Sequence, residues 1–280
     1  MRYVIMLVLL MLCGGMVGAQ DDTAELAPYE IAQARIAEAY ESGATTLDLS
    51  YLELTILPPE IGMLTNLTGL GLGNNALTAL PPEIGNLNQL EEIILFNNQL
   101  TTLPPEIGNL TQLTRIAASA NLITHLPPEI GNLEQLHSLL IAFNRLRHLP
   151  AEIGMLTQLA SLNLEGNPLQ ALPPELSNLE RLDSLRINGS QLRGLPHAIG
   201  GLTSLQYLYM DDNLWAQIPD EVEAQGTQAV VAYVRNQAQW HLRRMLGSGA
   251  LIVAGLVSVL WMLVRRRRLG RKTKPKRGEV

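Results

Sequence analysis

Aromatic residues and cysteine are scarce in this chain. Only 4% of its 280 residues are aromatic, two of them Phe, and Cys13 is the single cysteine. One cysteine excludes both a disulfide-stapled scaffold and a zinc site built from several cysteines. The sequence contains no G-x-S-x-G or H-E-x-x-H motif, so it lacks the residue patterns of serine hydrolases and zinc proteases. We therefore expect neither an enzyme nor a cofactor.

Lysine is absent outside the last sixteen residues, and the charge is strongly segregated as a result. The formal net charge of the whole chain is -6. Residues 20–264 hold ten Arg and twenty-five acidic residues, a net charge of -15, whereas residues 265–280 hold nine basic residues and one Glu, a net charge of +8. The modest total thus hides a strongly acidic main part and a strongly basic tail.

The first 19 residues have the pattern of a secretory signal peptide. Arg2 is followed by the apolar run Tyr3 to Leu12, and Val17-Gly18-Ala19 forms a small-residue cleavage site. We expect removal of residues 1–19, which would also remove Cys13. The alternative is an uncleaved anchor.

Residues 246–264 have the pattern of a transmembrane helix. These nineteen residues carry no charge, and about 20 are needed to cross a bilayer core. The basic residues of 265–280 follow directly, which marks the cytoplasmic side. We expect a single-pass protein of the cell membrane, with the N-terminal part outside and the basic tail near anionic lipid. A buried core helix, the alternative, would not be followed by such a basic cluster. Nucleic acid is not an expected partner, because the tail follows a membrane span.

A six-residue segment recurs at a constant interval of 23 residues. Leu57-Pro58-Pro59-Glu60-Ile61-Gly62 returns from Leu80, Leu103, Leu126, Leu149 and Leu172, with degenerate copies from Leu195 and Ile218. Upstream runs a pattern such as Leu67-x-x-Leu70-x-Leu72-x-x-Asn75-x-Leu77. The alternation around Leu70 predicts a short strand with its leucines on one side. Stacked copies would share one leucine core that no single repeat could bury alone.

In these repeats the chain resembles the leucine-rich repeat family, in its 23-residue Leu-Pro-x-x-Ile form. The resemblance covers residues 44–227 and implies an α/β solenoid of eight repeats. Its curved parallel sheet would line the concave face, and short helical or irregular segments would line the convex face. We further expect a capping helix within residues 20–43 and a C-terminal capping helix and stem in residues 228–245. The C-terminal cap resembles that of some bacterial members, which indicates a bacterial origin.

A series of asparagines falls where each strand ends, where an amide can satisfy buried backbone groups. The family resemblance implies that this series is an asparagine ladder. Ser190 and Leu52 interrupt the series. The ladder residues are Asn75, Asn98, Asn121, Asn144, Asn167 and Asn213.

The repeat frame also predicts which side chains face out of the concave sheet. In the third to fifth repeats these are Glu92, Ile94, Phe96, Asn97, Arg115, Ala117, Ser119, Ala120, Ser138, Leu140, Ala142 and Phe143. Ile94, Ala117 and Leu140 should form one apolar row, and contiguous exposed apolar surface indicates a partner. Alternatively, Phe96 and Phe143 fold back over the turn and pack locally. The predicted protein-binding residues are Ile94, Phe96, Arg115, Leu140, Phe143, Tyr207, Tyr209, Asp211, Asp212 and Trp215.

Three other patterns suggest chemistry but have simpler explanations. The glutamates of the Pro-Pro-Glu segments favour a helical N-terminus electrostatically. The glycines of Gly69-Leu70-Gly71-Leu72-Gly73 fall on a strand, and no phosphate-binding helix follows them. His125 and His148 share a repeat position on adjacent coils, but no third metal ligand accompanies them.

These features together predict a recognition or adhesion module at the cell surface, with a protein or peptide ligand on the concave face. Two alternatives remain open. The chain could be a receptor or accessory subunit that passes a signal to a partner enzyme, or a structural scaffold of the envelope.

Overall fold

The computed structural model describes residues 27–239, which form a single solenoid with an eight-stranded parallel sheet in sequence order, β1 to β8. The expected leucine-rich solenoid is confirmed. The expected signal peptide (1–19), membrane span (246–264) and basic tail (265–280) lie outside the described residues.

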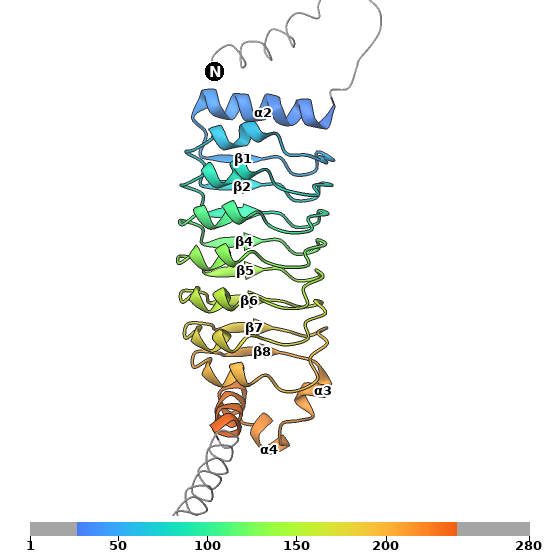
Figure 1. Ribbon diagram of the computed structural model, residues 1–280, viewed down its shortest axis with the longest axis vertical. Helices are drawn as coiled ribbons and strands as arrows, with labels where there is room; N and C mark the ends of the chain where they lie inside the picture. Colours follow the sequence, from blue (N-terminus) through green and yellow to red (C-terminus); the bar gives the residue numbers. More distant parts are fainter. Residues whose placement is uncertain (1–26, 240–280) are drawn as a thin grey trace, which may run out of the picture.

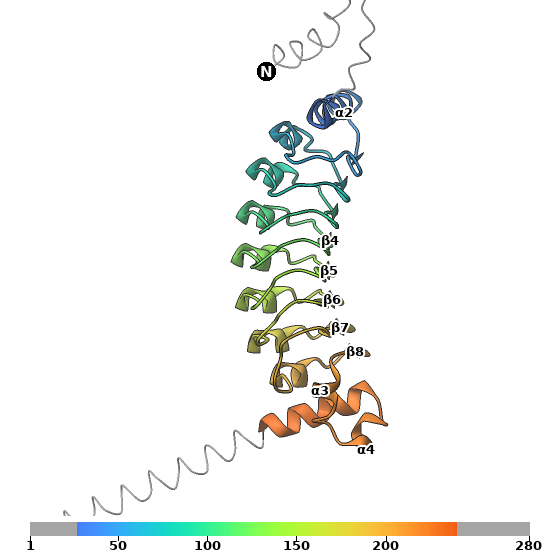
Figure 2. The same cartoon turned by 90° about the vertical axis from the view of Figure 1, so that its right-hand side faces the viewer.

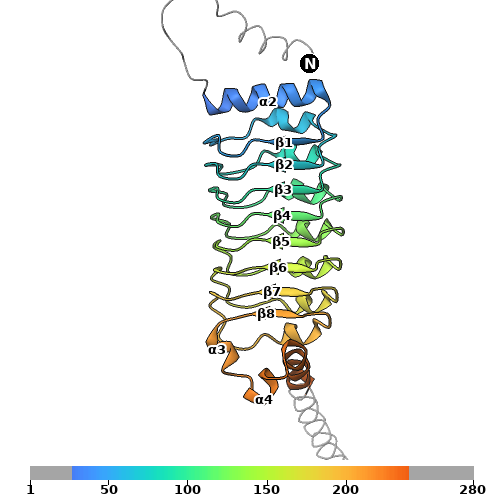
Figure 3. The same cartoon turned by 180° about the vertical axis from the view of Figure 1, so that it is seen from behind.

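Each strand is three residues long, and each of its residues pairs with the residue 23 positions later. Figure 3 shows the strands stacked in order down one side of the molecule. The constant register follows from the constant repeat length. The strands are β1 (Thr46–Asp48), β2 (Gly69–Gly71), β3 (Glu92–Ile94), β4 (Arg115–Ala117), β5 (Ser138–Leu140), β6 (Ser161–Asn163), β7 (Ser184–Arg186) and β8 (Tyr207–Tyr209). We call the turn of the solenoid that carries strand βn coil n.

Seven short 3-10 helices line the side opposite the sheet within the described residues. Figure 2 shows the array bowed, with the strands on the concave edge and the 3-10 helices on the convex edge. Each 3-10 helix begins after a proline whose backbone is extended. In η1 and η2 the first helical residue is a second proline, which costs no hydrogen bond because an N–H at that position would have no partner in the helix. They are η1 (Pro59–Met63), η2 (Pro82–Asn86), η3 (Pro105–Asn109), η4 (Pro128–Asn132), η5 (Ala151–Met155), η6 (Pro174–Asn178) and η7 (His197–Gly201).

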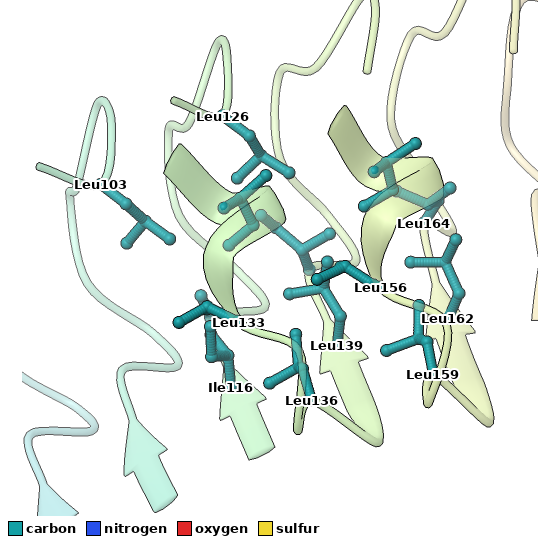
Figure 4. Close-up of a cluster of buried hydrophobic side chains, with 14 of the residues drawn as sticks. Leu103, Ile116, Leu126, Leu133, Leu136, Leu139, Leu156, Leu159, Leu162 and Leu164 are labelled. Atoms are coloured by element: carbon teal, nitrogen blue, oxygen red, sulfur yellow. The ribbon is translucent and has the colours of Figure 1, made fainter. Parts of the chain in front are cut away.

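Leucine and isoleucine side chains fill the space between these two layers. Figure 4 shows leucines of consecutive coils stacked between the strands and the 3-10 helices. The central residues of neighbouring strands, Ile116, Leu139 and Leu162, are paired in register and fully buried. Burying one such side chain contributes about 1.5–3 kcal/mol. The core is therefore continuous from coil to coil.

Helix α2 (Pro28–Ser42) covers the N-terminal end of the core (Figure 1). It buries Ala32, Ile36 and Ala39 and ends at Gly43, whose φ of 65° suits glycine. The Arg35 guanidinium donates to the carbonyl oxygen of Asp48 at 3.2 Å, at the edge strand β1. Burial raises the pKa of the Tyr29 phenol, and the Glu60 carboxylate raises it further, because α2 lies against η1.

The C-terminal end is covered by α3 (Asp212–Trp215), α4 (Asp220–Glu223) and a helix over residues 227–239. The last helix buries Val230, Val231 and Val234. Its Arg235 Nε donates to the carbonyl oxygen of Gly200 at 2.7 Å, which ties it to coil 7. Between residues 27 and 239, no helix has the length and apolar character needed to cross a membrane.

Candidate functional site

The sheet register arranges the concave face in rows of one residue per coil. One row runs Glu92, Arg115, Ser138 and the next runs Ile94, Ala117, Leu140. Arg115 Nε lies 3.3 Å from Glu92 Oε1, with both side chains about half exposed. An exposed pair of this kind contributes about 0–1 kcal/mol.

The apolar row exists, but its centre is less exposed than the sequence predicts. Ile94 and Leu140 are partly exposed, whereas Ala117 is only 7% exposed and Ala142, in the next row, only 2%. The expectation that Ala117 and Ala142 face solvent is therefore wrong. A methyl group on a strand between two longer side chains is covered by them. In this row Ile94 and Leu140 are therefore more exposed than Ala117, which lies between them.

Both phenylalanines lie at the same end of the strands and are exposed, Phe96 by 39% and Phe143 by 59%. Each ring also packs on a glycine of an adjacent coil. A Cβ built on Gly73 would lie 3.0 Å from Phe96 Cε1, and one built on Gly166 would lie 2.6 Å from Phe143 Cδ1. The predicted alternative of local packing thus holds for one face of each ring, and the remaining ring surface is open to a partner.

The residue before each ladder position adopts a left-handed conformation in seven successive coils. Asn and Gly, the residues that tolerate it best, occupy four of these positions, but Tyr51, Ala120 and Phe143 occupy the others. For a non-glycine residue the conformation costs about 1–2 kcal/mol. The full series is Tyr51, Asn74, Asn97, Ala120, Phe143, Gly166 and Gly189, with φ between 54° and 72°.

The predicted C-terminal cluster separates into exposed and structural residues. Tyr207 and Tyr209 are exposed on β8, and the Arg186 guanidinium lies 4.3 Å from the centre of the Tyr209 ring. Trp215, in α3, packs partly against the core, so only part of its indole is left for a partner. Asp212 is exposed in the first turn of the same short helix.

Asp211 has a structural task that the sequence reading missed. Its carboxylate accepts hydrogen bonds from the backbone N–H groups of Gly189 at 2.7 Å and Ser190 at 3.1 Å. In the preceding coils the equivalent N–H groups bond to a backbone carbonyl oxygen of the next coil, such as Gly166 N–H to Asn188 at 2.9 Å. The Asp211 carboxylate takes over these bonds where the chain leaves the repeat path and begins α3.

The asparagines at the strand ends each join their own coil to the one before it. Asn98 Oδ1 accepts from the Leu77 N–H at 3.0 Å, and its Nδ2 donates to the carbonyl oxygens of Leu72 at 2.9 Å and Leu95 at 3.1 Å. The same pattern recurs, shifted by 23 residues each time, at Asn121, Asn144 and Asn167. Asn75 makes it too, with an additional bond from the Leu52 N–H.

Asn213 does not belong to this series. It is exposed within α3, and the one bond its side chain donates goes from Nδ2 to the carbonyl oxygen of Leu192 at 3.1 Å. The assignment of Asn213 to the ladder is therefore wrong. The helix that begins at Asp212 redirects its side chain, and the side-chain bonds from this segment to the coil 7 backbone include those that Asp211 accepts from the Gly189 and Ser190 N–H groups.

The convex glutamates stand in the first turn of their 3-10 helices, next to a close contact between coils. A Cβ built on Gly85 would lie 2.8 Å from Glu106 Cβ and 2.9 Å from the Glu106 carbonyl oxygen. Gly62 and Gly108 have equally close neighbours in the coil that follows. The Ile-Gly pair of the repeated segment thus lets consecutive 3-10 helices approach.

The histidines of the repeats take part in local hydrogen bonds. The His125 ring lies 3.0 Å from Thr124 Oγ1 through Nδ1 and 3.3 Å from Thr102 Oγ1 through Nε2. In the part of the chain that the structure describes, no group of three or more His, Cys, Asp or Glu side chains could hold a metal ion.

Comparisons with known proteins agree with this architecture. A family model described as "Leucine rich repeat" matches residues 157–214, and a second, "Leucine Rich Repeat", matches residues 89–110. No curated protein sequence matches the chain.

Several solved structures are similar. A leucine-rich repeat protein of Leptospira interrogans is 38% identical, with a TM-score of 0.60, over 61% of this chain and 44% of that one. The leucine-rich repeat ectodomain of the Arabidopsis thaliana receptor kinase GASSHO1/SCHENGEN3, in complex with Casparian strip integrity factor 2, is 33% identical, with a TM-score of 0.55, over 61% and 22%. The structure of PEPR1–AtPEP1 is 28% identical, with a TM-score of 0.51, over 55% and 22%.

The chain spans less than half the length of each of these three structures. The repeats, the register of the sheet and the two family matches all point the same way. The described part of the chain is therefore built of leucine-rich repeats, and residues 89–110 and 157–214 match the family models.

Proposed function

We propose that this chain is a binding protein of the cell surface whose concave face captures a protein or peptide. Leucine-rich repeat proteins are usually non-catalytic binding modules. One observation carries the proposal for this chain: its only two phenylalanines stand half exposed on the face that also holds the Ile94 to Leu140 row.

Phe96 and Phe143 are the central anchors in this proposal. Each ring is already fixed on one side by a glycine, so binding would freeze little further side-chain motion. Aromatic anchors with low ordering cost are typical of residues that dominate binding energy. Ile94 and Leu140 supply the apolar surroundings, the Glu92–Arg115 pair borders them, and Tyr207 and Tyr209 extend the contact toward the C-terminal end.

The similar receptor ectodomain supports a ligand-binding role, because it was solved in complex with Casparian strip integrity factor 2. A receptor or accessory subunit remains the second candidate. In that case a partner protein would carry the signal.

The experiment begins with crosslinking and mass spectrometry on intact cells, which name candidate partners. Affinity is then measured between purified partner and full-length chain. Replacing Phe96 and Phe143 together with Asp should raise Kd by roughly 100-fold or more. The matched control is Met155→Asp, because Met155 is 54% exposed on the convex side. An unchanged Kd in the double variant, with its melting temperature retained, would contradict the proposal.

We also propose that the solenoid lies outside the cell and that residues 246–264 anchor it. The signal pattern of residues 1–19 and the basic residues after Val264 support this topology. The test uses single cysteines in a Cys13→Ser background and a membrane-impermeant maleimide. Thr111 is exposed on the solenoid, so Thr111→Cys should react with the maleimide in intact cells. Lys274→Cys should react only after lysis. The reverse pattern would overturn the topology.

A further inference from the structure

A cavity of about 490 Å³ opens between coils 6 and 7, on the lateral side of the solenoid. We use "lateral side" for the segments that run from each ladder position to the next 3-10 helix. The cavity is lined by apolar side chains, Leu172, Leu192 and Leu195, and by polar ones, Gln170, Gln191 and Arg193. A volume between about 300 and 1,000 Å³ is usual for a small-ligand site.

Small side chains lie beside this opening. The lateral residue just before the repeated Leu-Pro is His125 in coil 4, His148 in coil 5, Ala171 in coil 6 and Gly194 in coil 7. A Cβ built on Gly194 would meet no atom within 4 Å, so the space beside it is open. The leucines that follow show the effect: those of coils 1 to 5 are buried, whereas Leu172 and Leu195 are only partly buried.

The two walls are joined at one end, where the Gln191 N–H donates to the Leu169 carbonyl oxygen at 3.0 Å. Beyond that bond they are held to different neighbours. The Gln170 N–H donates to the Arg147 carbonyl oxygen of coil 5 at 3.0 Å. On coil 7, Gln217 Oε1 accepts from the Leu195 N–H at 3.1 Å, and Gln217 Nε2 donates to the Arg193 carbonyl oxygen at 3.4 Å. The cavity lies between these two segments.

The charge around the cavity is opposite in sign to that of the rest of the solenoid. Residues 27–239 hold eight Arg and twenty-two acidic residues, a net charge of -14. The lateral segments 145–148, 168–171 and 191–194 hold three of those Arg and no acidic residue. Arg193 is exposed, and its guanidinium makes no ion pair or hydrogen bond with any other part of residues 27–239. It is therefore available to an anionic ligand.

We propose that this cavity binds a carboxylate attached to a short apolar body. The apolar part packs on the partly buried Leu172 and Leu195, the carboxylate pairs with Arg193, and the amides of Gln170 and Gln191 supply hydrogen bonds at the rim. The carboxylate could belong to a free organic acid or to the end of a peptide. This site does not depend on the concave face.

The test measures fluorescence anisotropy with full-length protein in lipid nanodiscs. The probe is the tetrapeptide Gly-Gly-Leu-Phe, labelled with fluorescein at its N-terminus and carrying a free C-terminal carboxylate. The same peptide with an amidated C-terminus should bind about fivefold more weakly, as should the free-acid peptide to Arg193→Gln. Competition by 3-phenylpropionate, with 3-phenylpropanamide as its neutral match, reveals whether a free acid suffices.

A blocking variant ties the signal to the cavity. Gly194→Trp should abolish binding and retain the melting temperature, because the indole would enter open space, whereas Gly194→Ala should leave binding unchanged. Arg145→Gln removes another exposed lateral arginine and controls for general charge. Lack of binding by both the peptide and 3-phenylpropionate, or equal binding to Gly194→Trp, would overturn the site. Equal binding of the amidated and free peptides would overturn the carboxylate assignment.

Discussion

Replacing the ladder residue Asn121 should destabilise the solenoid far more than replacing Asn213, which does not make the ladder hydrogen bonds. In Asn121→Ala the Leu100 N–H, buried beneath the turn, loses the Oδ1 acceptor that lies 3.0 Å away. An unsatisfied buried donor costs about 1–3 kcal/mol. The carbonyl oxygens of Leu95 and Ala118 also lose a donor each.

Each of these two carbonyl oxygens keeps another donor, which limits the loss of unfolding free energy. Leu95 still accepts from Asn98 Nδ2 at 3.1 Å, and Ala118 still accepts from Asn144 Nδ2 at 3.0 Å. Each lost bond then costs no more than about 1 kcal/mol. Together with the orphaned N–H, the expected loss in unfolding free energy is about 3 kcal/mol.

Asn213→Ala is the matched control, because the same substitution there removes one partly exposed bond to Leu192. Its cost should stay below about 1 kcal/mol. Urea unfolding of both full-length variants, followed by circular dichroism, measures the difference. Equal losses in the two variants would refute the reasoning that coil-to-coil bonding, rather than the amide itself, makes the ladder residues important.

Three further substitutions test the packing. Gly85→Ala should lower the unfolding free energy by about 1–3 kcal/mol, because the new Cβ would lie 2.8 Å from Glu106 Cβ. Gly194→Ala, the control, should change it by less than about 0.5 kcal/mol. A similar shift of the urea midpoint in both variants would contradict the close-contact argument. Ala120→Gly should stabilise by up to about 1 kcal/mol, since relief of the left-handed conformation exceeds the added chain entropy, and a lower melting temperature would count against it. Leu139→Ala should cost about 2–5 kcal/mol in urea unfolding, and a loss under 1 kcal/mol would mean that the core collapses around the gap.

The repeat spacing alone predicts most of the architecture. A constant 23-residue interval fixes which residues pair across the sheet, so the Ile94, Ala117, Leu140 row follows from counting. Counting does not predict how exposed each member is. That depends on the size of the neighbours, and Ala117 is covered because Ile94 and Leu140 beside it are larger.

The same limit applies where the repeats lose their regularity. Asn213 occupies a ladder position by counting, yet the local sequence from Asp212 forms a helix in which its side chain is exposed and bonds to the Leu192 carbonyl oxygen instead. Repeat position assumes that the backbone path stays constant. At the C-terminal end helix formation competes with that path, and site assignments made from position alone fail there.

The departure of coil 8 from the repeat path also affects the lateral cavity. The Ser190 hydroxyl donates to Asp211 Oδ2 at 3.4 Å and accepts from the Leu192 N–H at 3.5 Å, whereas a ladder asparagine bonds to the coil before it. Asp211 and Gln217 bond to the backbone of coil 7 from the C-terminal side. Coil 7 stays joined to coil 6 by the β6–β7 pairing and by the Gln191 N–H, which donates to the Leu169 carbonyl oxygen at 3.0 Å, but Gly194 supplies no side chain to fill the space beyond that bond. Restoring the ladder with Ser190→Asn should draw coil 7 toward coil 6 and weaken peptide binding in the cavity, without any change in the residues that line it.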